Sequence, residues 1–178
     1  VENWDTSGWD DIKVPSSIQT IKDADGNFKY EKPIYVNQRY PWQNYENVSL
    51  GANVTAPTVN NSVGQYKRTF TVPSDWDGRD VFVSFEGVES AFYLYVNGQR
   101  VGYGEDSYTT DEFNITSYLK KGENTIAVEV YRWSTGSYLE NQDFIRMSGI
   151  FRDVNLYSKA KVEMRDLFVK TDLDDNYK

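Results

Sequence analysis

The 178-residue chain contains no cysteine and no histidine. Without cysteine it has neither a disulfide framework nor a thiolate nucleophile. Without histidine it cannot form a Ser-His-Asp or Cys-His catalytic system, and it lacks the commonest ligand of zinc. These absences exclude the most familiar forms of nucleophilic catalysis and a histidine-ligated zinc centre.

Basic residues and long apolar runs are also scarce. The chain has 19 Lys and Arg against 27 Asp and Glu, a formal net charge of −8. Proteins that bind nucleic acid need a basic patch to contact the phosphates, so the excess of acidic residues argues against nucleic acid as a partner. No apolar stretch approaches the ~18 residues of a membrane span. The chain does not begin with Met and shows no signal peptide. Its first residues, which include Trp4 and Trp9, are typical of a folded region. We therefore expect a fragment of a longer polypeptide.

Aromatic side chains are abundant, at 16% of the residues, with 14 Tyr and 5 Trp. Their flat apolar faces and polar tips suit both β-sheet cores and stacking on sugar rings. Core packing explains most of them. A chain of this length buries roughly 70% of its unfolded surface, which is enough for one domain.

The second half of the chain alternates apolar and polar residues with the period of two that indicates β-strands. Asn97-Gly98 predicts a type I′ hairpin turn, and a short helical turn is expected around Thr116–Leu119. The predicted strands are Tyr66–Val72, Val81–Glu86, Phe92–Val96, Ile126–Tyr131, Ile150–Tyr157 and Val162–Thr171. Strands at this spacing predict an all-β antiparallel sandwich.

The first sixty residues show weak periodicity and many Trp, Tyr, Asn and Pro residues. We interpret residues 1–62 as an irregular arm that wraps the sandwich, and residues 63–178 as the sandwich itself. One strand is expected near Asp11–Val14. Residues 43–62 are expected to form a long exposed loop.

One candidate binding segment lies between Pro33 and Trp42. Proline disfavours helix at the residue before it, so the segment is expected to be extended. Tyr35 and Asn37 then point to the same side, because side chains two apart share a face. A phenol and an amide can together bind sugar hydroxyls. The alternative is that Tyr35 packs on the core and Asn37 caps a turn.

The loop from Trp133 to Asp153 is the second candidate. Its carboxylates, Glu140 and Asp143, can accept hydrogen bonds from hydroxyls or hold a hard cation. For Glu140 we expect an ion pair with Arg146 or Arg152 instead, and for Asp153 an ion pair with its neighbour Arg152. Glu105 and Asp106 are adjacent in an expected strand and point to opposite faces, so they cannot flank one glycosidic bond.

Four motifs resemble those of glycoside hydrolase family 2. They are Pro33–Pro41 (PIYVNQRYP), Glu86–Gly98 (EGVESAFYLYVNG), Val101–Ser107 (VGYGEDS) and Tyr131–Val154 (YRWSTGSYLENQDFIRMSGIFRDV). They occur in the family's order, and the last spans more than twenty residues. The subgroup that the motifs resemble most is that of bacterial β-galactosidases of the lactose-operon type.

The resemblance implies a jelly-roll sugar-binding domain, similar to galactose-binding domains, at the N-terminus of a multidomain enzyme. It implies that Asn37 and Asp143 contact the substrate, with Tyr35 beside them, and that Asp143 binds sodium in some members. Two positions depart from the subgroup: Thr135 stands where it has Asp, and Ile145 where it has Trp. Arg152 and Glu140 are expected to be structural.

The resemblance also implies that this domain carries no catalytic residue and no cofactor of its own beyond possible sodium. A later (β/α)8 barrel of the same polypeptide would carry two catalytic glutamates for retaining hydrolysis, with magnesium in that catalytic domain. The expected partners are a β-galactoside, the barrel and possible further copies of the enzyme. Two alternatives stay open: a stand-alone carbohydrate-binding module, and the same domain of a β-glucuronidase or β-mannosidase.

Overall fold

The computed structural model describes residues 4–37, 39–42 and 55–177, and its regular elements are strands and single turns of 3₁₀-helix. In chain order they are η1 (Ile18–Thr20), β1 (Ile34–Val36), β2 (Val63–Thr71), η2 (Ser74–Trp76), β3 (Asp80–Phe85), β4 (Val88–Glu89), β5 (Ala91–Val96), β6 (Gln99–Glu105), β7 (Asp111–Asn114), η3 (Thr116–Tyr118), β8 (Glu123–Tyr131), η4 (Gly136–Tyr138), β9 (Phe144–Arg146), β10 (Gly149–Ile150) and β11 (Val154–Lys159).

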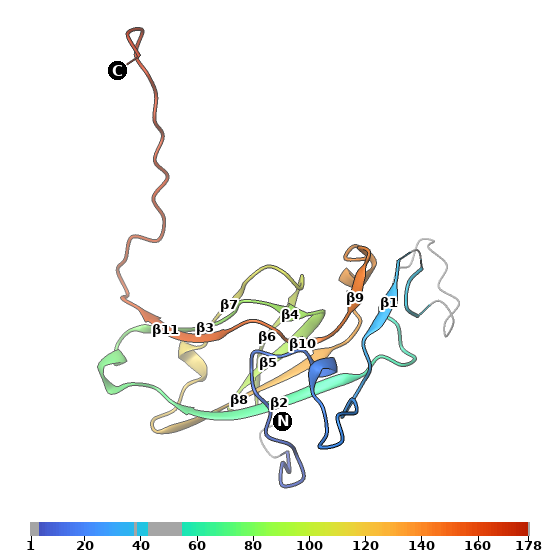
Figure 1. The fold of residues 1–178 in the computed structure, drawn as a ribbon. Coiled ribbons are helices and arrows are strands. Elements are labelled where there is room, and N and C mark those ends of the chain that lie inside the picture. The colour runs from blue at the N-terminus through green and yellow to red at the C-terminus, as the bar shows by residue number, and fades with distance from the viewer. Residues whose placement is uncertain (1–3, 38, 43–54, 178) are drawn as a thin grey trace.

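Two antiparallel sheets pack face to face (Figure 1). One has the strand order β2-β8-β5-β6, and the other has the order β11-β3-β7. Alternate residues of each strand point into the space between the sheets and form one buried cluster, which includes Val83 of β3, Leu94 of β5 and Val130 of β8. The antiparallel sandwich predicted from the alternation is confirmed, and so is the jelly-roll fold that the family resemblance implied.

Several local predictions are also confirmed. The strand predicted at Tyr66–Val72 is β2, and the helical turn near Thr116 is η3. Asn97 and Gly98 both have positive φ, 49° and 79°, as a type I′ turn requires. The strand predicted at Ile150–Tyr157 is divided into β10 and β11.

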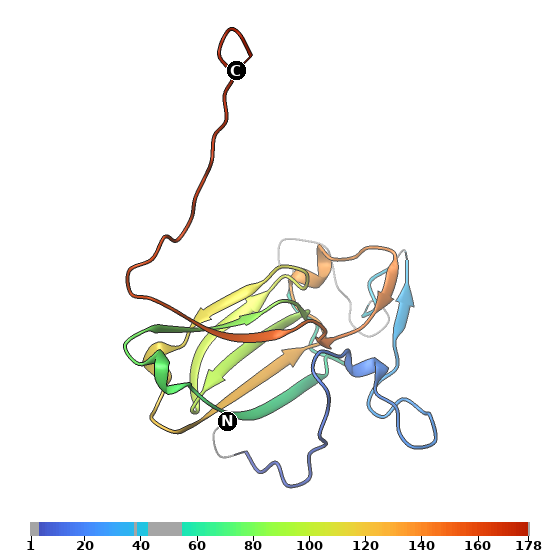
Figure 2. The same ribbon diagram turned by 60° about the vertical axis from the view of Figure 1, so that its left-hand side comes forward.

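Two predicted strands are wrong. Residues 11–14 belong to no strand, and residues 162–171 run away from the sandwich as an extended tail (Figures 1 and 2). In the tail, the side chains of Val162 and Phe168 are 91% and 78% exposed. Alternation gives a segment an apolar face, but a strand also needs a neighbour to accept its backbone hydrogen bonds. No described strand lies beside either segment.

The N-terminal arm lies against the chain around β10. The backbone N–H groups of Ser16 and Ile18 donate hydrogen bonds of 2.8 Å to the carbonyls of Ile150 and Ser148. The expected loop at residues 43–62 is described only from residue 55, and residues 55–62 contain no regular element. No helix in the described part of the chain is long and apolar enough to cross a membrane.

A second, smaller core supports one end of the sandwich. Trp42 and Trp133 are buried with ring centroids 5.2 Å apart, and Tyr138 lies 5.0 Å from Trp42. Ile34 of β1 and Tyr40 pack against this cluster. The cluster therefore joins β1 to η4, which precedes the loop that carries Asp143.

Candidate functional site

The predicted site residues meet on a two-stranded ribbon formed by β1 and β9, which lie side by side at one end of the molecule (Figures 1 and 2). The pairing is antiparallel, with Val36 opposite Phe144. Asn37 directly follows β1 and Asp143 directly precedes β9, so the register brings these two residues to the same end of the ribbon.

Tyr35, Asn37 and Asp143 lie together on the exposed side of this ribbon. The Tyr35 hydroxyl interacts with the carboxylate of Asp143 and with the side chain of Asn37. The interaction with Asp143, followed by desolvation, raises the pKa of Tyr35 above its ordinary value of 10, and the interaction with Asn37 opposes this shift. All three side chains are exposed, with Tyr35 at 60%. The structure therefore brings the three predicted residues together where a ligand can reach them.

Arg146 holds the backbone segment that precedes Asp143, residues 140–142, in place. Its guanidinium donates a 2.7 Å hydrogen bond to the backbone carbonyl of Glu140 and another of 2.7 Å to the side-chain oxygen of Asn141. It also donates to the carbonyl of Gln142. Arg146 is 4% exposed, so these bonds form largely out of water. A single buried cation thus holds the three residues that precede Asp143.

The ion pair predicted for Glu140 is wrong. Its two carboxylate oxygens accept hydrogen bonds of 2.7 Å from the backbone N–H and the hydroxyl of Ser107. Arg146 reaches only the backbone carbonyl of Glu140. The carboxylate instead joins the loop after β6 to the loop after η4, because a loop N–H and a buried hydroxyl both need an acceptor.

The ion pairs predicted for Arg152 are also wrong. Arg152 donates to the backbone carbonyls of Glu86, at 3.2 Å, and Tyr108, at 2.9 Å. It forms no salt bridge with either Asp153 or Glu140. Loop carbonyls that no strand partner satisfies accept its hydrogen bonds.

Glu89 is a half-buried acid close to these cations. Burial, followed by the charge of Glu140, raises the pKa of Glu89 from about 4.5 to about 7. The backbone of Met147 and the charges of Arg146 and Arg132 act in the opposite direction. Arg132 is itself buried and paired with Glu31 at 2.7 Å.

Thr135 and Ile145 stand at the two positions that depart from the family pattern. The hydroxyl of Thr135 donates a 2.7 Å hydrogen bond to Glu105, which also accepts one from the backbone N–H of Gly136. Ile145 is 51% exposed on the ribbon, opposite Tyr35. Neither belongs to the group formed by Tyr35, Asn37 and Asp143.

The site can donate and accept hydrogen bonds but does not by itself form a complete cation centre. Hard cations take about six or more oxygen ligands, whereas one carboxylate, one phenol and one amide meet here. In the described part of the chain, no group of three or more Asp, Glu, Cys or His residues could hold a metal ion. Sodium at Asp143 stays a prediction that requires oxygen ligands from elsewhere.

Sequence reasoning missed the supporting roles of Arg146, Glu89 and Ser107. Their partners are distant in the sequence or are backbone carbonyls, and neither kind of contact leaves a local pattern. The only available signal was Arg146 itself, an arginine three residues after Asp143.

The family model and the curated relatives both identify glycoside hydrolases. The model of the family described as "Glycosyl hydrolases family 2, sugar binding domain" matches residues 2–160. A β-galactosidase of Priestia megaterium is 56% identical over 169 residues, which cover 95% of this chain and 15% of that protein. A β-galactosidase of Halalkalibacterium halodurans is 46% identical over 171 residues, or 96% of this chain and 16% of that protein.

Among solved structures, a β-glucuronidase of Bacteroides uniformis is similar with a TM-score of 0.53 and 31% identity, over 56% of this chain and 12% of that one. The chain spans about 15% of the length of the curated relatives named above. With the family model matching nearly its whole length, the chain belongs to glycosyl hydrolases family 2 and corresponds to the sugar-binding domain of that family.

Proposed function

We propose that this domain contributes Asn37, Asp143 and Tyr35 to the galactose-binding subsite of a retaining β-galactosidase. The observation that carries the proposal is the grouping of these three exposed side chains on the β1–β9 ribbon. The two β-galactosidases that are 56% and 46% identical to this chain over the aligned residues support galactose as the sugar.

The chemistry of the three groups suits a sugar with several hydroxyls. The Asp143 carboxylate interacts with the Tyr35 hydroxyl and keeps lone pairs for hydroxyl donors of a ligand. Asn37 adds a donor and an acceptor beside it. Charge-assisted bonds to Asp143 would hold the sugar most strongly, while the anchored loop keeps the carboxylate in place.

The catalytic step belongs to another part of the proposed enzyme. A later (β/α)8 barrel would provide the acid/base and nucleophile glutamates, and this domain would position the galactose ring against them. Sodium bound at Asp143 would add a positive charge near the sugar hydroxyls. The isolated 178-residue chain is expected to hydrolyse no galactoside.

Replacement of Asp143 in the full-length enzyme tests the proposal. Asp143→Ala is expected to lower kcat/KM for a chromogenic β-galactoside by about 10- to 100-fold, since it removes charged hydrogen bonds of about 1.5–3 kcal/mol. Asp153→Ala removes an exposed carboxylate ten residues away and serves as the matched control. Wild-type kcat/KM in a folded Asp143→Ala enzyme would disprove the site.

A β-glucuronidase is the second candidate, favoured by the similarity to the B. uniformis β-glucuronidase. Assays of the full-length enzyme with matched galactoside and glucuronide substrates separate the two. We expect the galactoside to be the better substrate, because the exposed Asp143 carboxylate would repel the anionic carboxylate of a glucuronide. A kcat/KM in the opposite order would favour the second candidate.

A further inference from the structure

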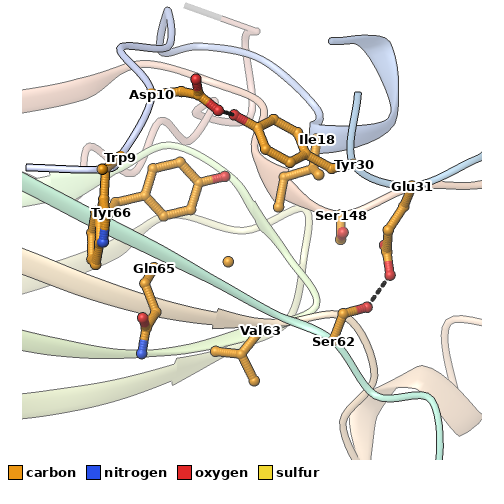
Figure 3. A pocket seen from close by; sticks show the side chains of 12 residues that line it. Trp9, Asp10, Ile18, Tyr30, Glu31, Ser62, Val63, Gln65, Tyr66 and Ser148 are labelled. Carbon is orange, nitrogen blue, oxygen red and sulfur yellow. Dashed lines mark hydrogen bonds between the residues drawn. The ribbon is translucent and has the colours of Figure 1, made fainter. Parts of the chain in front are cut away.

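A separate hollow lies between the N-terminal arm and the start of β2 (Figure 3). Its volume is about 340 Å³, at the small end of the range of about 300–1,000 Å³ for small-molecule sites. None of Tyr35, Asn37 and Asp143 lines it. Its lining residues come from the arm, η1, β2 and the chain before β10: Gly8, Trp9, Asp10, Ile18, Tyr30, Glu31, Ser62, Val63, Gly64, Gln65, Tyr66 and Ser148.

The hydroxyl of Tyr66 is the unusual group in this hollow. It is buried, and its hydrogen has no acceptor among the described residues. Burial raises the pKa of Tyr66 to about 12, and the backbone N–H of Ile150 opposes that shift. Figure 3 shows the hydroxyl pointing toward the middle of the surrounding side chains. Buried polar groups almost always have a partner, so this hydroxyl is available to donate a hydrogen bond to a ligand oxygen that enters the hollow.

Two partly exposed aromatic rings border the same space. Trp9 is 38% exposed and Tyr30 is 45% exposed. The hydroxyl of Tyr30 donates a hydrogen bond to Asp10, which Lys29 also binds at 2.5 Å. The Tyr30 ring is therefore fixed before any ligand arrives, and such pre-organisation lowers the entropy lost on binding.

The polar groups of the rim are mostly acceptors. Glu31 accepts hydrogen bonds from Ser62, from Gln19 at 3.0 Å and from Arg132 at 2.7 Å, and its carboxylate keeps further lone pairs. Gln65 adds an exposed amide. Two carboxylates, those of Asp10 and Glu31, disfavour an anionic ligand. Apolar ring faces combined with hydroxyl acceptors suit a neutral ring that carries hydroxyls on its edge.

We propose that this hollow is a second carbohydrate site, which binds one neutral pyranose unit of a saccharide. An apolar face of the sugar ring packs on Trp9 or Tyr30, and a sugar oxygen accepts the hydrogen bond of Tyr66. The site is independent of the Asp143 subsite, because the two share no lining residue and lie on different strands.

Titration of the ¹⁵N-labelled chain with lactose tests the proposal, with the Asp143→Ala variant used throughout so that binding at the Asp143 subsite is weakened. The indole N–H signal of Trp9 is expected to shift saturably in the millimolar range. The signals of Trp42 and Trp133, which are 2% and 6% exposed, are expected to stay in place. Tyr66→Phe removes only the hydroxyl and is expected to weaken lactose binding about two- to tenfold.

Tyr95→Phe is the matched control, because its hydroxyl binds Glu129 at 3.1 Å outside the hollow. This variant is expected to bind lactose as the parent does. Trp9→Ala has no Trp9 indole signal, so its lactose binding is measured by saturation transfer to lactose. This variant is expected to show a clear loss of lactose binding. The proposal is overturned if the Trp9 signal does not saturate, if Tyr66→Phe and Trp9→Ala both bind like the parent, or if lactose binding disappears with Asp143→Ala alone.

Discussion

The carboxylate of Glu140 accepts hydrogen bonds of 2.7 Å from both the backbone N–H and the hydroxyl of Ser107. Ser107 is fully buried. The pair connects the loop after β6 with the loop that carries Asp143, so it links the sandwich to the candidate site. Glu140, three positions before the proposed sugar-binding residue Asp143, thus has a structural role.

Removal of the Ser107 hydroxyl should destabilise the fold. In Ser107→Ala, one oxygen of a partly buried carboxylate loses its donor, so the free energy of unfolding is expected to fall by about 1.5–3 kcal/mol. Urea unfolding measures the change. Ser74→Ala, at an exposed serine whose side chain makes no hydrogen bond within the described residues, should change it by less than about 0.5 kcal/mol. Equal stabilities for the two variants would contradict this role of Glu140.

The alternating strands could be predicted because the residues themselves carry the signal. Phe92, Leu94 and Val96 are all at most 1% exposed, so period and burial coincide. The segment at 162–171 has a similar pattern but no neighbouring strand, and local sequence contains no information about a missing neighbour. Asn97 fits its predicted turn, yet it also donates a 2.8 Å hydrogen bond to Asn124, which no turn rule anticipates.

The site was predictable only in part. Spacing alone could place Tyr35 and Asn37 on one side of an extended segment, but it could not place Asp143 beside them. That proximity comes from the pairing of β1 with β9, a contact between distant parts of the sequence. The resemblance to a family supplied this missing information. The acceptors of Arg146 are mainly backbone carbonyls. Every residue has a backbone carbonyl, so the amino-acid sequence does not indicate which of them Arg146 binds.

Gly102 of β6 should tolerate no side chain. A Cβ there would lie 2.5 Å from the Cε1 atom of Phe113, whose ring packs edge-on against Phe92 and Phe85. Gly102→Ala is therefore expected to lower the free energy of unfolding by about 1–3 kcal/mol. Gly8→Ala, where nothing lies within 4 Å of the added atom, is the control. Thermal unfolding of both variants checks the prediction, and an unchanged Tm for Gly102→Ala would refute it.

Arg146→Lys should loosen the loop before Asp143 without removing a charge. Lysine is a point charge and cannot reproduce the planar fork that reaches Glu140, Asn141 and Gln142 together. Hydrogen exchange at amides 141–143 is expected to accelerate, and galactoside kcat/KM in the full-length enzyme to fall at least threefold. Arg68→Lys, at an exposed position of β2, should change neither quantity. Faster exchange with unchanged kcat/KM would show that the loop does not position the sugar.

Glu89 should make the stability of the chain depend on pH. Burial, followed by the charge of Glu140, raises its pKa from about 4.5 to about 7 in the folded state. Between these two values the folded chain holds a proton that the unfolded chain has released. Stability contributed by this group is therefore greatest below about pH 4.5, falls as the pH rises, and is lowest above about pH 7.

Glu89→Gln replaces the titrating carboxyl with a neutral group of the same shape. The variant should match the wild type in unfolding free energy near pH 4.5 and exceed it by roughly 1–3 kcal/mol at pH 8, at about 1.4 kcal/mol per unit of pKa shift. Urea unfolding at several pH values measures this difference. The pKa of Asp111 is also raised, to about 6, but its effect is present in both proteins and cancels. A difference that stays constant from pH 4.5 to 8 would mean that Glu89 keeps its charge in the fold, with Arg132 and Arg146 outweighing its burial.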